Sequence, residues 1–380
     1  MIRVSLLMEQ HLGHRTYYEN IRRHVDKDSR LHVNWFPITY RKEGGMLEKI
    51  PFIPTRISGT VRGMLQVREA LRRSSADLIF YNTQVPAAIG GAIFRRYPYV
   101  LATDLTPIQY DAMATHYDHL ADKKGISQKL KHLVNRQLYR SAELLLPWSQ
   151  WTRNSLINDY GADPAKIKVL PPGVDLNIWH PAETRVSGPL RILFVGGDFA
   201  RKGGRTTIDA FKMLAPGSAE LHVVTKTALP EMLGMVVYND ITPNSPKLIS
   251  LYQKCDVFVL PSEAEAFGIA AVEACATGLP VVATRTGGLN EIVEDGKTGF
   301  SLPARQPEEL AKRLRILSEN MELRAKMGRA ARQRAELLYD AKVNAGRLVD
   351  YMIALWQERR ILSASRIDAA SQGNLRNKSR

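Results

Sequence analysis

The chain has 380 residues, 44% of them hydrophobic, and a formal net charge of +15. It is too long for one hydrophobic core, so two domains are expected and disorder as the main state is excluded. The positive charge suits nucleic acid, anionic lipid or phosphorylated small molecules equally well.

The two cysteines, Cys255 and Cys275, have no metal-ligand spacing. This argues against a disulfide framework or a structural zinc site and fits a reducing cytoplasm. The first apolar run is broken at Glu9, too early for a secretory signal, and no later run is long enough to span a bilayer. Any membrane contact is therefore expected to be peripheral.

Short β-branched runs alternate with helical patterns, which indicates parallel sheets built from βαβ units. Strands are predicted in the first half at 2–8, 31–38, 76–83, 98–104, 143–149 and 167–173. After a polar passage rich in Pro and Gly, strands are predicted at 191–197, 220–226, 235–240, 255–262 and 280–286.

The repeated pattern predicts an α/β fold of two Rossmann-like, doubly wound domains, at 1–178 and 179–340, with ligand sites facing one cleft. A closing helix is expected at about 341–362, packed back on the first domain. The small, polar and basic residues 363–380 are expected to form a disordered tail.

The segment PSEAEAFGIAAVEACATGLPVVA places two carboxylates, Glu265 and Glu273, in apolar surroundings. A helix is predicted from about 267–268 to Thr277, so that its first-turn N–H groups form an anion site approached closely at Gly268. Carboxylates cannot hold a diphosphate, but they accept hydrogen bonds from sugar hydroxyls. The alternative is that Glu265 caps the helix and Glu273 lies on a solvated face, which the Ala/Val/Cys-rich flanks disfavour.

The stretch PSEAEAFGIAAVEACATGLPVVATRTGGLNEIVEDGKTGF resembles the donor-site signature of the retaining glycosyltransferase family 4. Paired glutamates, Phe-Gly between them, Gly-Gly-x-x-Glu and Asp-Gly-x-Thr-Gly carry the resemblance. VLPPGVDLNIWHP and GGDFARKGG extend it over about residues 169–340, whereas the first half matches less closely.

This resemblance implies the GT-B architecture and sugar transfer with retention from a UDP- or GDP-sugar, without a cofactor or an essential metal. The residues it assigns to the donor are Gly13, Arg201, Lys202, Glu265, Phe267, Gly268, Ile269 and Glu273. Lys202, with Arg201 beside it, matches the basic diphosphate-binding positions, although Gly197 and Asp198 stand where relatives often have an arginine. Glu265 is expected to serve the sugar and Glu273 the ribose.

The first domain is expected to bind the acceptor through His14, Asp104 and His119. Many relatives have a histidine near the position of Asp104, which here could bind the acceptor hydroxyl, assist its deprotonation, or cap a turn. The catalytic assignment therefore comprises Asp104, Lys202 and Glu265. Glu291 is expected to cap or orient a loop rather than to contact the donor.

Residues 123–140 contain six Lys or Arg and no acid, with apolar residues at helical spacing. This segment either lies on anionic lipid or packs its apolar side on the sheet. The first alternative implies a glycan or lipid-linked acceptor at the cytoplasmic face of a membrane.

A nucleotide-sugar epimerase or hydrolase remains an enzymatic alternative to the glycosyltransferase. A nucleic-acid-binding protein is a third, but no nucleic-acid module is recognisable, so no nucleic-acid partner is expected.

Overall fold

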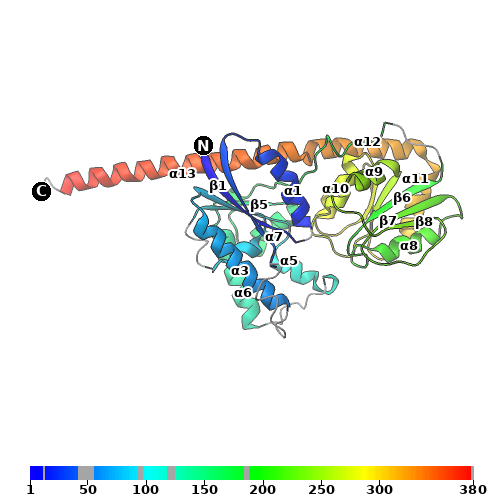
Figure 1. The fold of residues 1–380 in the computed structure, drawn as a ribbon, viewed down its shortest axis with the longest axis horizontal. Helices are drawn as coiled ribbons and strands as arrows, with labels where there is room; N and C mark the ends of the chain where they lie inside the picture. The colour runs from blue at the N-terminus through cyan, green and yellow to red at the C-terminus, as the bar shows by residue number, and fades with distance from the viewer. Residues whose placement is uncertain (12, 42–54, 92–96, 118–124, 184–187, 378–380) are drawn as a thin grey trace.

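The computed structural model describes residues 1–380 apart from 12, 42–54, 92–96, 118–124, 184–187 and 378–380. It contains two parallel sheets that lie side by side along the molecule, each with helices around it (Figure 1). The strand order is β2-β1-β3-β4-β5 in the first sheet and β11-β10-β9-β6-β7-β8 in the second. The predicted class of two parallel α/β domains is confirmed.

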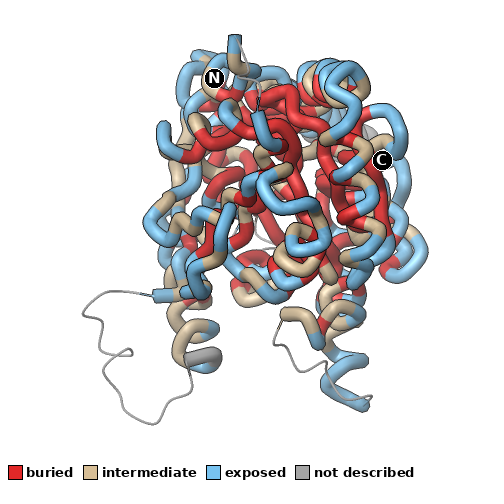
Figure 2. Tube along the Cα trace, turned by 90° about the vertical axis from the view of Figure 1, so that its right-hand side faces the viewer, coloured by how far each residue is buried: buried red, intermediate tan, exposed pale blue. Residues whose placement is uncertain are grey.

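The first domain follows the predicted alternation of strands and helices. Its strands are β1 (Ile2–Glu9), β2 (Leu31–Ile38), β3 (Leu78–Tyr81), β4 (Tyr99–Thr103) and β5 (Leu144–Pro147). Its helices are α1 (Gly13–Val25), α3 (Thr55–Arg73), α4 (Gln84–Ile89), α5 (Pro107–Ala112), α6 (Ile126–Ser141) and α7 (Gln150–Asn158), with 3-10 turns η2 (Ala114–His116) and η3 (Pro164–Lys166). Strands β3 and β4 are buried along their whole length, as is typical of a parallel sheet with helices on both faces. Figure 2 shows buried segments gathered inside the molecule and exposed segments around them.

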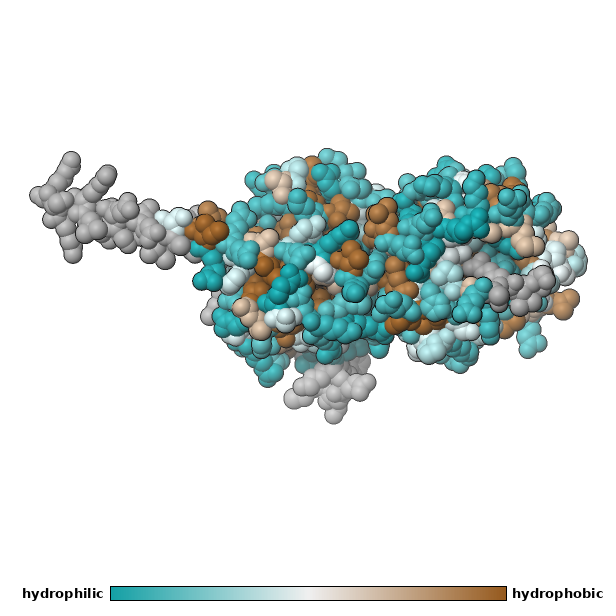
Figure 3. Space-filling view, turned by 90° about the horizontal axis from the view of Figure 1, so that it is seen from above, coloured by the Kyte–Doolittle hydropathy of each residue, from teal (hydrophilic) through white to brown (hydrophobic). Residues whose placement is uncertain are grey.

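The second domain repeats this arrangement. Its strands are β6 (Leu190–Val195), β7 (Ala219–Val224), β8 (Met235–Tyr238), β9 (Val257–Leu260), β10 (Val281–Thr284) and β11 (Gly299–Leu302). Its helices are α8 (Gly204–Lys212), α9 (Pro246–Lys254), α10 (Ile269–Ala276), α11 (Pro307–Glu319) and α12 (Met321–Leu338), with the 3-10 turn η4 (Gly287–Glu291). The surface seen in Figure 3 is mostly hydrophilic, with hydrophobic residues in separate patches.

The strands of the structure differ from the prediction in two places. The segment 167–173 forms no strand, and Ile167 makes only an isolated bridge with Leu145. Pro171 and Pro172 lack the N–H groups that a further ladder would need, so the chain leaves the sheet there. Strand β11 was not predicted, because four residues that begin with a glycine give too weak a pattern.

The chain crosses between the domains at two adjacent places. Val174 and Asp340 form a parallel bridge, and the Val174 amide donates to the Tyr339 carbonyl at 2.9 Å. A Cβ on Gly173 would lie 2.5 Å from the Ala341 nitrogen, so only glycine permits this close approach.

The last helix, α13 (Ala341–Asn377), packs against α1 of the first domain and buries Leu348, Val349 and Met352. It continues beyond residue 362, where the sequence had placed the start of a disordered tail. Residues 363–377 contain no proline and a single glycine, Gly373, so nothing in the sequence terminates the helix sharply.

Candidate active site

The loop after β9 leads directly into α10, which begins at Ile269, within two residues of the predicted start. Gly268 is the residue before the first turn and has φ of 104°, a conformation that a residue with a Cβ rarely adopts. No side chain among the described residues caps this helix. The Ala271 amide donates to the Gly268 carbonyl at 2.9 Å, so the N–H groups of Ile269 and Ala270 are the ones available to an anion, at the positive end of the helix dipole.

Glu265 and Lys202 come together beside this helix end. The Lys202 Nζ lies 3.0 Å from Glu265 Oε2, and both side chains are largely buried. The contact depends on Gly203, which has φ of 77° and whose Cβ would lie 2.0 Å from the Pro261 carbonyl oxygen. A glycine is thus needed to bring the loop after β6 against the loop after β9.

Arg201 is buried in the same place, but its guanidinium already has protein partners. It donates to Asp198 Oδ2 at 2.9 Å and to the Ala264 carbonyl at 2.8 Å. It also lies 4.5 Å from the ring centroid of Tyr117, which belongs to the first domain. Arg201 is therefore arranged to hold the loop of Ala264 and to contact the other domain, while Lys202 is the cation nearer Glu265, at 3.0 Å against 4.0 Å for Arg201.

Glu273 lies inside the protein in the second turn of α10, with 5% exposure. Its Oε2 accepts from the Tyr252 hydroxyl at 3.0 Å. Burial raises the pKa of Glu273 to about 7, although the Tyr252 hydrogen bond and the Lys202 charge act in the opposite direction. The solvated-face alternative for Glu273 is therefore wrong.

In the first domain, His14 and Asp104 face each other, with Nε2 and Oδ2 3.5 Å apart. Burial lowers the pKa of His14, but the charge and hydrogen bond of Asp104, together with the charge of Glu9, outweigh it, so the net pKa lies above its usual value. The Nδ1 atom of His14 is buried and has no hydrogen-bond partner among the described residues. Such an atom is a natural contact for a ligand or a water molecule.

The N-termini of α1 and α10 meet across the interface between the domains. A Cβ on Gly13 would be 3.5 Å from the Ile269 side chain, an ordinary contact distance. The two predicted half-sites are thus adjacent, since His14 follows Gly13 and Glu265 precedes α10. His119 lies outside the described residues.

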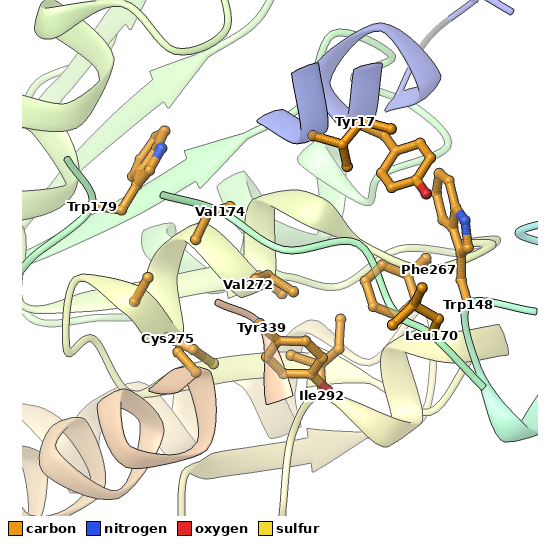
Figure 4. Close-up of a cluster of buried hydrophobic side chains, with 14 of the residues drawn as sticks. Tyr17, Trp148, Leu170, Val174, Trp179, Phe267, Val272, Cys275, Ile292 and Tyr339 are labelled. Atoms are coloured by element: carbon orange, nitrogen blue, oxygen red, sulfur yellow. The ribbon is translucent and has the colours of Figure 1, made fainter. Parts of the chain in front are cut away.

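A cluster of aromatic side chains packs between the two domains, next to the N-termini of α1 and α10 (Figure 4). Trp148 from the first domain packs against the His14 ring at 5.0 Å and against Phe267 of the second domain at 5.9 Å. Phe267 is also 6.1 Å from Tyr339 at the second crossing. Phe267, predicted to face the donor through its N–H, therefore directs its side chain into the core between the domains.

Sequence analysis did not identify three residues that contribute to the site: Tyr252, Tyr117 and Trp148. Tyr252 lies 21 positions from its partner Glu273, and no local spacing links them. A weak signal existed for Trp148, because it lies at the end of the predicted strand at 143–149, and strand ends in such sheets face the ligand cleft. Glu291 does cap, as expected, but its target is helix α7 of the other domain.

Comparison with known proteins shows the class of proteins to which this chain is similar. A model of glycosyl transferases group 1 matches residues 177–334, and one of glycosyltransferase family 4 matches residues 31–178. Sucrose-phosphate synthase from Thermosynechococcus elongatus superposes with a TM-score of 0.74 at 16% identity, covering 94% of this chain and 100% of that one. HepE of Anabaena, solved with UDP-glucose, gives 0.69 at 19% identity, with 93% and 100% covered. The fold is that of the GT-B glycosyltransferases.

Relatives in sequence identify the family within this class. The D-inositol 3-phosphate glycosyltransferase of Kineococcus radiotolerans is 32% identical over 330 residues, 75% of this chain and 73% of the relative. The enzyme of the same name from Paenarthrobacter aurescens is 34% identical over 207 residues, 48% of this chain and 50% of the relative. The match to the latter thus spans about half of that relative's length. The chain belongs to glycosyltransferase family 4.

Proposed function

We propose that this protein is a retaining, metal-independent glycosyltransferase that moves a sugar from a UDP- or GDP-sugar to a hydroxyl acceptor. The observation that carries the proposal is the contact of Lys202 with Glu265 beside the uncapped end of α10. A cation, free amides and a sugar-binding carboxylate are the groups that a nucleotide-sugar requires.

In this proposal the pyrophosphate binds the amides at the start of α10, and Lys202 turns from Glu265 toward it. Glu265 is then free to accept from hydroxyls of the sugar, and Glu273 accepts from the ribose. The acceptor oxygen bonds to the anomeric carbon as the bond from that carbon to the phosphate oxygen breaks. Negative charge grows on the departing diphosphate, so Lys202 and the amides stabilise the transition state more than the ground state.

His14 and Asp104 occupy the opposite side of the site and are placed for the acceptor. The acceptor's proton leaves either to Asp104 or to the departing phosphate, which needs no metal for this role. The catalytic residues of the proposal are therefore Lys202, Glu265 and Asp104, with His14 as a binding residue.

The donor is tested by heating the protein with UDP, GDP, ADP or an oligonucleotide. A rise in melting temperature with one diphosphate and not with the oligonucleotide is expected. Incubation with the matching nucleotide-sugars and candidate acceptors, analysed by NMR, should then give a product with the donor's anomeric configuration. Sugar release or epimerisation that ignores the acceptor would support the hydrolase or epimerase alternative, and binding of the oligonucleotide alone would reject the enzyme.

The surface of α6 supports an acceptor located at a membrane. Ile126, Leu130 and Leu133 are 86%, 61% and 57% exposed, whereas the buried side of the helix holds Asn135, Leu138 and Tyr139. The expectation that the apolar residues pack on the sheet thus holds for Leu138 but is wrong for Leu130 and Leu133. None of the described helices is long and apolar enough to cross a bilayer.

The exposed apolar stripe of α6 has Lys129, Arg136 and Arg140 along one flank and no acid in the helix. This combination suits a helix lying in the surface of an anionic bilayer. Sedimentation with phosphatidylglycerol vesicles should deplete the protein from solution, and phosphatidylcholine vesicles should not. Acceptor trials should compare lipid-linked glycans with soluble inositol phosphate, the acceptor that the relatives' names indicate. Equal partition to both kinds of vesicle, or activity on the soluble acceptor alone, would reject the proposal that the acceptor lies at a membrane.

A further inference from the structure

The N-terminus of α7 is completed by a side chain from the other domain. Glu291 Oε2 accepts from the Gln150 amide at 2.8 Å, and Oε1 accepts from the Trp151 amide at 2.7 Å. The next amide, of Thr152, is capped within the first domain by the Ser149 hydroxyl at 3.1 Å. Two of the three amides at this helix end therefore have partners only while the domains are in contact.

Glu291 is also tied to the donor side of the site. It ends the turn η4, whose Gly288 amide donates to the Ala266 carbonyl at 3.0 Å, in the loop that carries Glu265. A Cβ on Gly287 would lie 1.9 Å from the Glu265 carbonyl oxygen, so the two segments are in direct backbone contact. The Glu291 carbonyl accepts from Arg334 at 2.6 Å, which fixes the end of the turn.

Helix α7 is in turn hydrogen-bonded to Asp104, on the proposed acceptor side of the site. The Thr152 hydroxyl donates to the Asp104 carbonyl at 2.5 Å. A continuous path of contacts thus runs from the Glu265 loop through η4 and Glu291 to α7 and Asp104. Charge-assisted bonds to backbone amides are stronger than neutral ones, and a carboxylate at a helix N-terminus gains further from the dipole.

We propose that Glu291 is a positioning residue, which latches the two domains together by capping α7 and thereby sets the Glu265 loop against Asp104. The coupling to catalysis rests on the proposed function, whereas the latch itself does not. Separation of the domains exposes the Gln150 and Trp151 amides to water and leaves the Thr152 cap unchanged.

Amide hydrogen exchange at single-residue resolution tests the latch without any donor. In Glu291→Ala, exchange at Gln150 and Trp151 should be at least tenfold faster than in the unmodified protein, and exchange at Thr152 should stay within about twofold. Glu291→Gln, which keeps one carbonyl oxygen, should give an intermediate effect. The matched control is Glu309→Ala, since Glu309 pairs with Lys312 within α11 of its own domain. Unchanged exchange at both amides in Glu291→Ala would overturn the latch.

Kinetics with the identified donor tests the coupling. Glu291→Ala should lower kcat by at least tenfold, while the dissociation constant of the nucleoside diphosphate changes by less than threefold, because no nucleotide group is assigned to Glu291. Equal losses in diphosphate binding and turnover would show a donor ligand instead, and would overturn the positioning role. If no nucleotide-sugar is turned over at all, the proposed function fails, and the exchange experiment still decides the latch.

Discussion

Replacement of Glu273 by glutamine should change how the stability of the protein depends on pH. The pKa of Glu273 is about 7 in the folded chain, because of burial, against a usual value of 4.5. The folded state therefore holds a proton that the unfolded state has lost between these two pH values. Since the acid's folded pKa is raised, stability falls as pH rises from about 4.5 to about 7 and is constant above.

A tenfold change in an ionisation equilibrium corresponds to about 1.4 kcal/mol, so this group accounts for roughly 3 kcal/mol of lost stability at pH 8. Glutamine keeps a carbonyl oxygen for the Tyr252 hydroxyl and carries no charge at any pH. Glu273→Gln should therefore unfold nearly like the unmodified protein at about pH 4 and should be more stable by roughly that amount at pH 8.

Urea unfolding at intervals of pH from about 3 to about 8.5 measures this difference. Glu263→Gln is a control of opposite sign, because the hydrogen bond from Arg305 lowers the pKa of Glu263. That control should be less stable than the unmodified protein at neutral pH, and the gap should close as pH falls below the usual value. Stability curves for Glu273→Gln and the unmodified protein that stay parallel across the whole range would refute the reasoning.

Three further predictions concern the donor side. Lys202→Ala should lower kcat more than it raises the KM for the donor, because charge on the diphosphate grows as the bond breaks; equal effects on both would contradict this. Gly203→Ala should destabilise the second domain by more than about 2 kcal/mol in urea unfolding, because its Cβ would overlap the Pro261 carbonyl in a left-handed backbone; near-normal stability would rule out the close approach. EDTA should leave turnover unchanged, and activity restored only by added Mg²⁺ or Mn²⁺ would reject the metal-independent mechanism.

Local patterns predicted much of the fold and the donor side of the site. Parallel strands buried on both faces give continuous apolar runs, so most strands and the start of α10 were placed from the sequence. Lys202 and Glu265 were assigned to one donor from the sequence, and both lie in loops at the same edge of one parallel sheet, but their direct contact was not predicted.

Contacts between distant segments were not predictable in this way. The pattern around Glu273 shows that a buried carboxylate needs a partner, but only the packing of α9 on the second domain supplies the Tyr252 hydroxyl. Likewise, Gly-Gly-x-x-Glu indicates a capping residue, whereas its target at Gln150 depends on how two domains meet. The exposure of Leu130 and Leu133 was undecidable because an apolar helix side gives the same periodicity whether it faces a sheet or solvent.

The packing of α13 on α1 has a consequence for biosynthesis. The first domain leaves the ribosome first, yet Leu348, Val349 and Met352, which cover it, are translated after the whole second domain. Until those residues emerge, the nascent chain carries an uncovered apolar face that chaperones and proteases can recognise. Completion of the amino-terminal domain is thus postponed until the second domain has been synthesised, and a nonsense mutation inside the second domain would leave both domains incomplete.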